Sequence, residues 1–331
     1  MPINDVRNTV LAIANKNNYG YISPQDFNLY CQQAQMDIFE DYFYQYNNWI
    51  NRENARTSGT GYADIVKNLE EVIDSFSADA FLTQLPIDQG TRNRYQLPAD
   101  YYLINKLYYY PTSLFTGTNT LVGAFKLTDN TKTFVSTPST MINPPIGSLV
   151  VNTTTGDQAY VTAVDSADTL SLSANIMNLN DAYSIYSATN ITEVERVNQN
   201  KLFLLTSSNL TAPTSQYPAY VLGGASSNVA TPNAVIGNTV EVYPSTIVQQ
   251  YAIRVQYIRY PLPPQWTYTS LQSGEPLFNA ASTSYQNFEL PVSDEPGLIA
   301  KICQYVGIEI REEDVFKFGQ QEEINETQET S

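Results

Sequence analysis

Three groups of neighbouring carboxylates are the residues whose types and spacing best suit chemistry. They are Glu193 with Glu195, Asp294 with Glu295, and Glu312 with Glu313 and Asp314. Two facing carboxylates suffice for glycoside hydrolysis, one as the acid and the other as the base or nucleophile. Each group lies on a polar stretch, however, where charged side chains are usually solvated. We therefore expect surface charges and not a catalytic pair.

The absence of histidine narrows the possible chemistry further. It removes the usual general base, the Ser-His and Cys-His nucleophile pairs, and the commonest zinc ligand. The segment Thr57-Ser58-Gly59-Thr60-Gly61 lacks the third glycine and preceding strand of a dinucleotide loop, and also the Gly-Lys ending of a P-loop. We expect no catalytic residue, no cofactor and no enzymatic activity.

Two further sets of residues are candidates for a metal site or a disulfide. Asp165, Asp168 and Asn152 fall on predicted turns, where their oxygens could bind calcium, but their spacing is not that of an EF-hand loop. Cys31 and Cys303 lie far apart in the sequence, in two predicted amphipathic helices. We expect no metal site, and we expect two buried reduced thiols in place of a disulfide.

The composition favours contacts with other proteins. Only 15% of the residues are charged, whereas 25 are tyrosines, whose apolar ring and hydroxyl group suit interfaces. The net charge is −16 and the basic residues form no run, so a clamp on nucleic-acid phosphates is not expected. The N-terminus lacks the basic and apolar regions of a secretory signal. No run approaches the ~20 apolar residues of a membrane-spanning helix.

Three segments are candidates for contacts between subunits or with partners. A predicted helix starts at Ser23-Pro24-Gln25-Asp26 and runs to about Ile50. Its aromatic stripe is Phe39, Tyr42, Phe43, Tyr46 and Trp49. Such a stripe is more often core, but a block of this size cannot bury all of it, so we expect part of it at a subunit interface.

The other two segments are predicted to dock partners. The loop with Trp266 and Tyr268 follows a proline stop, and it either folds onto its own sheet or docks a partner. The acidic C-terminal arm contains Glu312, Glu313, Phe316 and Phe318. We expect a neighbouring protein to hold this arm, because an isolated acidic tail has little to pack against.

The periodicity predicts an α+β fold with an N-terminal helical bundle and an antiparallel β core. A small β-barrel or sandwich module is inserted into the core, because short alternating runs such as 158–164 and 169–172 are separated by turn signals. A C-terminal helix with the acidic arm follows. The predicted boundaries are 1–78 for the helical block, 79–112 with 191–293 for the β-rich domain, 113–190 for the module, and 294–331 for the C-terminal helix and arm.

This layout resembles the head-to-tail connector and ring (adaptor) proteins of tailed bacteriophages, particularly of the short-tailed and crAss-like groups. The resemblance rests on the helical block from Ser23 to Phe76, the turn Tyr95-Gln96-Leu97-Pro98-Ala99-Asp100-Tyr101-Tyr102, and Val255-Gln256-Tyr257-Ile258-Arg259-Tyr260-Pro261 followed by Phe288-Glu289-Leu290-Pro291. The runs Gly147-Ser148-Leu149-Val150-Val151-Asn152 and Val161-Thr162-Ala163-Val164-Asp165-Ser166 are similar to β modules of phage virion proteins.

The resemblance implies a structural virion protein, assembled in the host cytoplasm as a homo-oligomeric ring, expected to be a dodecamer. Its partners would be the portal protein and neighbouring tail or ring proteins. DNA would pass through the ring without specific binding, and no membrane would be involved. Two other functions stay open. One is a phage tail protein that binds a receptor or carbohydrate through the β module, and a weaker one is a virion glycoside hydrolase.

Overall fold

The computed structural model describes residues 1–14, 22–55, 63–85, 93–111, 113–134, 144, 146–187, 191–223, 238–248, 251–272, 275–310 and 320. The chain has a mixed α and β fold with mostly antiparallel sheets, as the sequence predicts. It divides into two compact units, one formed by Met1–Phe76 with Tyr260–Ser331 and the other by Ser77–Arg259.

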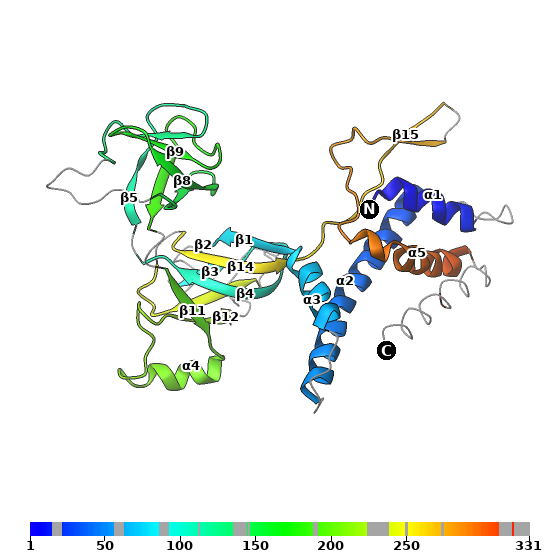
Figure 1. The fold of residues 1–331 in the computed structure, drawn as a ribbon, viewed down its shortest axis with the longest axis horizontal. Coiled ribbons are helices and arrows are strands. Elements are labelled where there is room, and N and C mark those ends of the chain that lie inside the picture. Colours follow the sequence, from blue (N-terminus) through cyan, green and yellow to red (C-terminus); the bar gives the residue numbers. More distant parts are fainter. Residues whose placement is uncertain are drawn as a thin grey trace, which may run out of the picture. The chain divides into compact units, whose positions relative to one another are not determined.

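The first unit contains the long helices (Figure 1). They are α1 (Ile3–Ala14), α2 (Pro24–Ala55), α3 (Ala63–Asp74) and α5 (Glu295–Ile310). The start of α2 agrees with the prediction, because the Asp26 backbone N–H donates to Ser23 Oγ at 3.1 Å and the Ser23 hydroxyl donates to the Asp26 carboxylate. Helix α2 contacts both α3 and α5, and α5 also contacts α1. Cys31 and Cys303 are buried and unpaired.

Residues 260–293 belong to this helical unit and not to the β-rich domain in which the sequence analysis placed them. The backbone of Trp266 exchanges hydrogen bonds with the Asn28 side chain at 2.8 and 3.1 Å. Gln35 Nε2 donates to the Leu262 carbonyl at 2.8 Å. These amide groups, supplied by α2, pair with a segment more than two hundred residues away. The segment also contains β15 (Tyr268–Ser270), β16 (Pro276–Phe278) and the short helix η3 (Val292–Asp294).

The second unit contains an eight-stranded sheet that nearly closes into a barrel. Its strands are β1 (Ser77–Phe81), β2 (Thr83–Gln84), β3 (Arg94–Gln96), β4 (Tyr101–Tyr109), β11 (Thr192–Arg196), β12 (Ala219–Gly223), β13 (Thr239–Tyr243) and β14 (Ile253–Arg259), in the order β1-β14-β4-β11-β12-β13-β3-β2. The edge strands β1 and β2 are joined by Leu82 alone, so the chain passes directly from one edge to the other. Leu82, Tyr95, Leu107 and Val240 are among the side chains that fill the core.

This unit also contains a six-stranded antiparallel sheet, and we call it the module. Its strands are β5 (Ser113–Thr118), β6 (Lys126–Thr128), β7 (Leu149–Asn152), β8 (Gln158–Val164), β9 (Thr169–Leu172) and β10 (Ala182–Tyr186), in the order β5-β10-β7-β8-β9-β6. Strands β8 and β9 have the predicted bounds, whereas β5 and β6 were not predicted. Phe134, which lies in none of these strands, is buried in the module core.

Strands β11 and β12 are parallel neighbours, and α4 (Gln199–Thr206) forms the connection between them. Residues 192–206 thus contain both a strand, β11, and a helix, α4. A helix is needed here because parallel neighbours cannot be joined by a tight turn. Strand β12 follows a polar, proline-containing stretch and pairs with β13 in an antiparallel arrangement.

Candidate functional site

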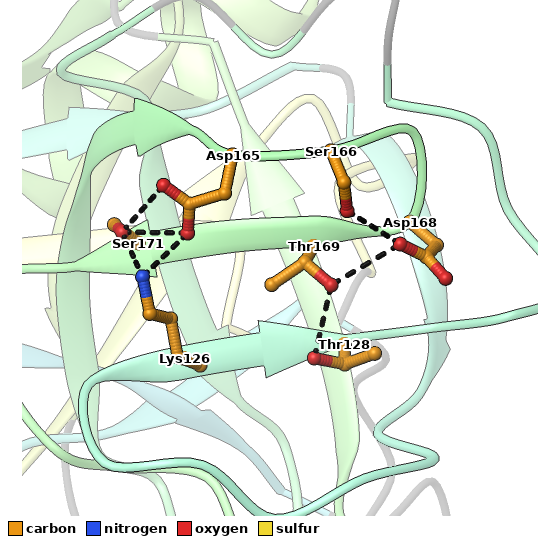
Figure 2. Close-up of polar contacts among 7 residues, drawn as sticks. All are labelled: Lys126, Thr128, Asp165, Ser166, Asp168, Thr169 and Ser171. Atoms are coloured by element: carbon orange, nitrogen blue, oxygen red, sulfur yellow. Dashed lines mark hydrogen bonds and ion pairs between the residues drawn. The ribbon is translucent and has the colours of Figure 1, made fainter.

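Two of the three residues considered for calcium, Asp165 and Asp168, belong to two neighbouring hydrogen-bonded groups in the module, and we call these groups together the cluster (Figure 2). The Asp165 carboxylate accepts hydrogen bonds from Lys126 Nζ at 2.5 Å and from Ser171 Oγ at 2.8 Å. The Asp168 carboxylate accepts from the Ser166 hydroxyl at 2.6 Å. The Lys126 ammonium thus neutralises Asp165 as a bound cation would. Among the described residues, no group of three or more acids and cysteines could hold a metal ion.

The same cluster contains a serine beside a lysine, a pairing that can serve nucleophilic catalysis. Ser171 Oγ lies 2.7 Å from Lys126 Nζ. A lysine that forms an ion pair with Asp165 is a protonated ammonium, however, and it has no lone pair with which to accept the hydroxyl proton. Hydrogen bonds from Lys126 and Ser171 also lower the pKa of Asp165, which keeps its carboxylate ionised. The cluster therefore ties β6 to β9 and to the turn that follows β8.

Asn152 lies outside that cluster and holds the loops of the module. Its side-chain amide donates to the Asp181 carboxylate at 2.7 Å and to the Ile176 carbonyl at 2.8 Å. The side-chain oxygen of Asn152, Oδ1, accepts a hydrogen bond from the backbone N–H of Thr154 at 2.9 Å. All of these contacts are internal to the module, so the role of Asn152 is structural.

Two of the described carboxylates considered for glycoside hydrolysis, Glu193 and Asp294, have partners other than a second carboxylate. Glu193 forms an exposed ion pair with Lys106 at 3.2 Å. Asp294 accepts hydrogen bonds from the Tyr42 hydroxyl and, at 2.9 Å, from the Ser293 hydroxyl. Residues 312–314 lie outside the described part of the chain, as do Phe316 and Phe318.

Much of the aromatic stripe on α2 packs within its own chain. Phe39 is fully buried and its ring centroid lies 5.1 Å from that of Phe76. Tyr42 is buried and bonded to Asp294, and the half-buried Tyr46 donates to Glu70 at 2.9 Å. Phe43, also half-buried, contacts Phe39 edge to face. The side chain of Trp49 is outside the described part. Phe39 and Tyr42 are therefore core residues, which leaves little of the described stripe for a second subunit.

Trp266 is buried as well, which argues against the docking role considered for it. Its side chain is 2% exposed and its Nε1–H donates to Asn4 Oδ1 at 3.1 Å. The Arg7 guanidinium lies 3.9 Å from the Trp266 ring centroid, a cation–π geometry. Tyr268 stacks on the same ring and stays partly exposed. The prolines before this loop suggested that it is exposed. Asn4 of α1 and Asn28 of α2 nevertheless bond to Trp266 and cover it.

Among the residues that the structure describes, the three most exposed large apolar side chains, Leu210, Tyr217 and Phe203, lie on the connection between β11 and β12. We call residues 199–217 the crossover lobe; it contains α4 and the loop that follows (Figure 1). Leu202 and Leu205 pack against Val197 and Val221. Phe203 and Leu204 are 77% and 69% exposed. A helix turns about 100° per residue, so four consecutive apolar residues cannot all face one sheet.

The exposed part of the lobe continues beyond the helix on a hydrogen-bonded backbone. Leu210 is 95% exposed and Tyr217 is 80% exposed. The Thr211 hydroxyl donates to the Leu205 carbonyl at 2.9 Å, and Tyr217 N–H donates to the Thr214 carbonyl at 3.1 Å. This surface was not predicted from the sequence, although the run Leu202-Phe203-Leu204-Leu205 in a nearly uncharged stretch is a usable signal.

A second exposed apolar surface lies on two loops of the module, and we call it the module loop pair. It consists of Leu121, Val122, Phe125 and Leu179. The loops are bonded to each other, because the Phe125 backbone N–H donates to Asn175 Oδ1 at 3.2 Å and Asn180 N–H donates to the Asn119 carbonyl at 2.9 Å. Phe125 adopts a φ of 57°, which is unfavourable for a bulky residue.

Comparison with known proteins assigns this chain to no family. No protein-family model matches the sequence, and no curated protein matches it. Within the described ranges, none of the helices combines the length and the apolar character needed to cross a bilayer.

Proposed function

We propose that this chain is a non-enzymatic structural subunit of a bacteriophage virion. It forms a homo-oligomeric ring in the head-to-tail connector or tail, links the portal protein to the tail, and surrounds the DNA channel. The observation that carries the proposal is that two surfaces, the crossover lobe and the module loop pair, expose large apolar side chains on hydrogen-bonded backbone. Contiguous exposed apolar side chains mark protein contacts.

A subunit of a stacked ring needs surfaces with which to bind other proteins, and the crossover lobe and the module loop pair are two candidates for them. Each subunit touches its neighbours around the ring and also the proteins above and below. The sequence supports the same role, because a net charge of −16 repels DNA and keeps it mobile in a channel. We further infer that the six-stranded module is a small β-barrel inserted into the host fold, since one continuous segment, 113–186, supplies all of its strands.

Native mass spectrometry of the purified full-length chain tests this proposal. We expect one dominant assembly, a dodecamer, across a wide concentration range. A parallel pull-down with immobilised polysaccharides tests the rival function, a receptor- or carbohydrate-binding tail protein. A monomer or trimer that binds the polysaccharides would contradict the ring and support that rival. Glycoside turnover abolished by both Glu193→Gln and Glu195→Gln would contradict the non-enzymatic role.

A further inference from the structure

We infer that the crossover lobe, residues 199–217, is the surface through which one copy of this chain binds a second copy. The inference rests on the proposed ring and assigns the contact that closes it. It is carried by the exposure of Phe203, Leu204, Leu210 and Tyr217 together with the distribution of charge along the chain.

The lobe lies in a stretch without acidic residues, where two copies of an acidic chain can make contact with little repulsion. Lys201 is the single charged residue among residues 198–238, although the whole chain carries a net charge of −16. Two copies of so acidic a chain repel each other less where one of the two meeting surfaces carries no negative charge. Interface cores are depleted of charged residues and enriched in aromatic ones, as this lobe is.

The charge that the lobe does carry indicates the kind of surface that it meets. Lys201 is exposed on α4, beside Phe203 and Leu204. An acidic surface of a second copy complements this cation, whereas a two-fold contact of the lobe with itself would bring two lysines together and supply no acid. The contact is therefore head-to-tail, and head-to-tail contacts generate rings when the rotation closes.

The area of the exposed side chains is in the range that such a contact needs. Taken together, the exposed parts of the four side chains present on the order of 500 Å² of surface. A standard interface buries about 800 Å² on each partner, so these side chains supply more than half of it. The remainder comes from the polar residues of the lobe, which are typical of an interface rim.

A double substitution, Phe203→Ser with Leu204→Ser, tests the inference in the full-length chain. Both side chains are largely exposed, so folding should be preserved, and circular dichroism checks this. The matched control is Val292→Ser, which removes a 72% exposed side chain from the other unit. Sedimentation velocity should show the dissociation concentration raised at least about tenfold by the double substitution and unchanged by the control.

Zero-length carbodiimide cross-linking then tests the partner surface. We expect Lys201 to link to an Asp or Glu of another copy, and we expect Lys201→Gln to remove that link without changing the fold. Mixing chains with and without heavy isotopes identifies links between copies. If the wild type forms rings and the double variant forms them equally well, the lobe is not the contact, and the proposed function stands. A wild-type chain that stays monomeric contradicts both.

Discussion

The two β regions of the second unit are held together in different ways. The eight-stranded sheet is filled with aliphatic and tyrosine side chains, and Asn93 and Thr239 are its buried polar residues within the described ranges. The module, although smaller, holds six of the ten buried polar side chains described, namely Asn119, Thr128, Asp129, Ser148, Asn152 and Asp181. The barrel-like sheet thus depends on apolar burial, whereas the module also depends on hydrogen-bonded carboxylates and amides.

The hydrogen bonds of Asp129 and Asp181 show why these two buried carboxylates are tolerated in the module. The Asp129 carboxylate accepts from the Tyr183 hydroxyl at 2.7 Å and from the Thr131 hydroxyl at 2.6 Å. The Asp181 carboxylate accepts the Asn178 backbone N–H at 2.8 Å. A buried polar group with satisfied hydrogen bonds specifies one loop conformation, and the same group left unpaired is costly. The module should therefore hold its exposed loop pair rigidly.

Low pH should produce the largest difference in stability between the eight-stranded sheet and the module. Within the described residues, the carboxyl groups whose pKa is lowered all belong to the module, namely Asp129, Asp165, Asp168 and Asp181. At Asp129 burial raises the pKa, but hydrogen bonds from Thr131 and Tyr183 outweigh it and the net shift is downward. At Asp181 the Asn178 backbone N–H and the Asn152 amide lower the pKa.

The sign of the pH dependence follows from these shifts. A carboxyl with a depressed pKa in the folded state stabilises the fold above its unfolded pKa of about 3.9 and loses that contribution as the pH falls through the folded pKa. Below pH ~4 the module should therefore open before the eight-stranded sheet. Pepsin digestion read by mass spectrometry checks this, and earlier cleavage within residues 192–259 than within 113–186 would refute it.

Truncating a side chain of the apolar core should instead destabilise the eight-stranded sheet more than the module. Leu107 is fully buried in the eight-stranded sheet. Leu107→Ala removes buried methyl groups and leaves a cavity, which should lower the free energy of unfolding by about 3 kcal/mol. Urea unfolding followed by hydrogen exchange of this sheet measures the change. A loss confined to the module would show that the two regions do not unfold as described.

A smaller change should affect the module alone. A Cβ added at Gly117 would collide with Asp129 Oδ2 and with the Tyr183 hydroxyl, the two groups that bond each other in the core. Gly117→Ala should therefore destabilise the module by about 2 kcal/mol. Thr116→Ala, on the exposed face of the same strand, is the control and should change stability by less than ~0.5 kcal/mol. Equal effects of the two substitutions on thermal unfolding would count against the packing described.

The surface ion pairs should matter least. Lys126 and Asp165 are 40% and 34% exposed, so solvent screens their attraction, and Lys126→Met should cost only about 0.5 kcal/mol. The ion pair of Lys106 with Glu193 is more exposed, so Lys106→Met should lower the free energy of unfolding by still less. Thermal unfolding at low and high salt checks both variants. A much larger loss at Lys126, rescued by calcium, would revive the calcium site.

The sequence predicted those elements whose signals are local. Ser23 and Asp26 mark the start of α2 through a cap within four residues, and β8 and β9 alternate clearly between turns. Strand β5 pairs with β10, more than sixty residues later, and its Thr- and Gly-rich sequence carries no comparable signal. Trp266 is buried by Asn4, Arg7 and Asn28, which a reading of its own loop cannot include.

The candidate surface was missed for a related reason. The four apolar residues at 202–205 fit a strand or a helix, and only the pairing of β11 with β12 shows which of them face the sheet. Exposure is a property of the whole unit, whereas periodicity reports only the local chain.

Negative-stain imaging of the full-length wild-type chain tests the central claim most directly. The proposed function predicts class averages of closed rings with a central channel, in which every subunit is equivalent. Monomers or compact trimers without a channel, at concentrations well above those of an ordinary purification, would contradict it.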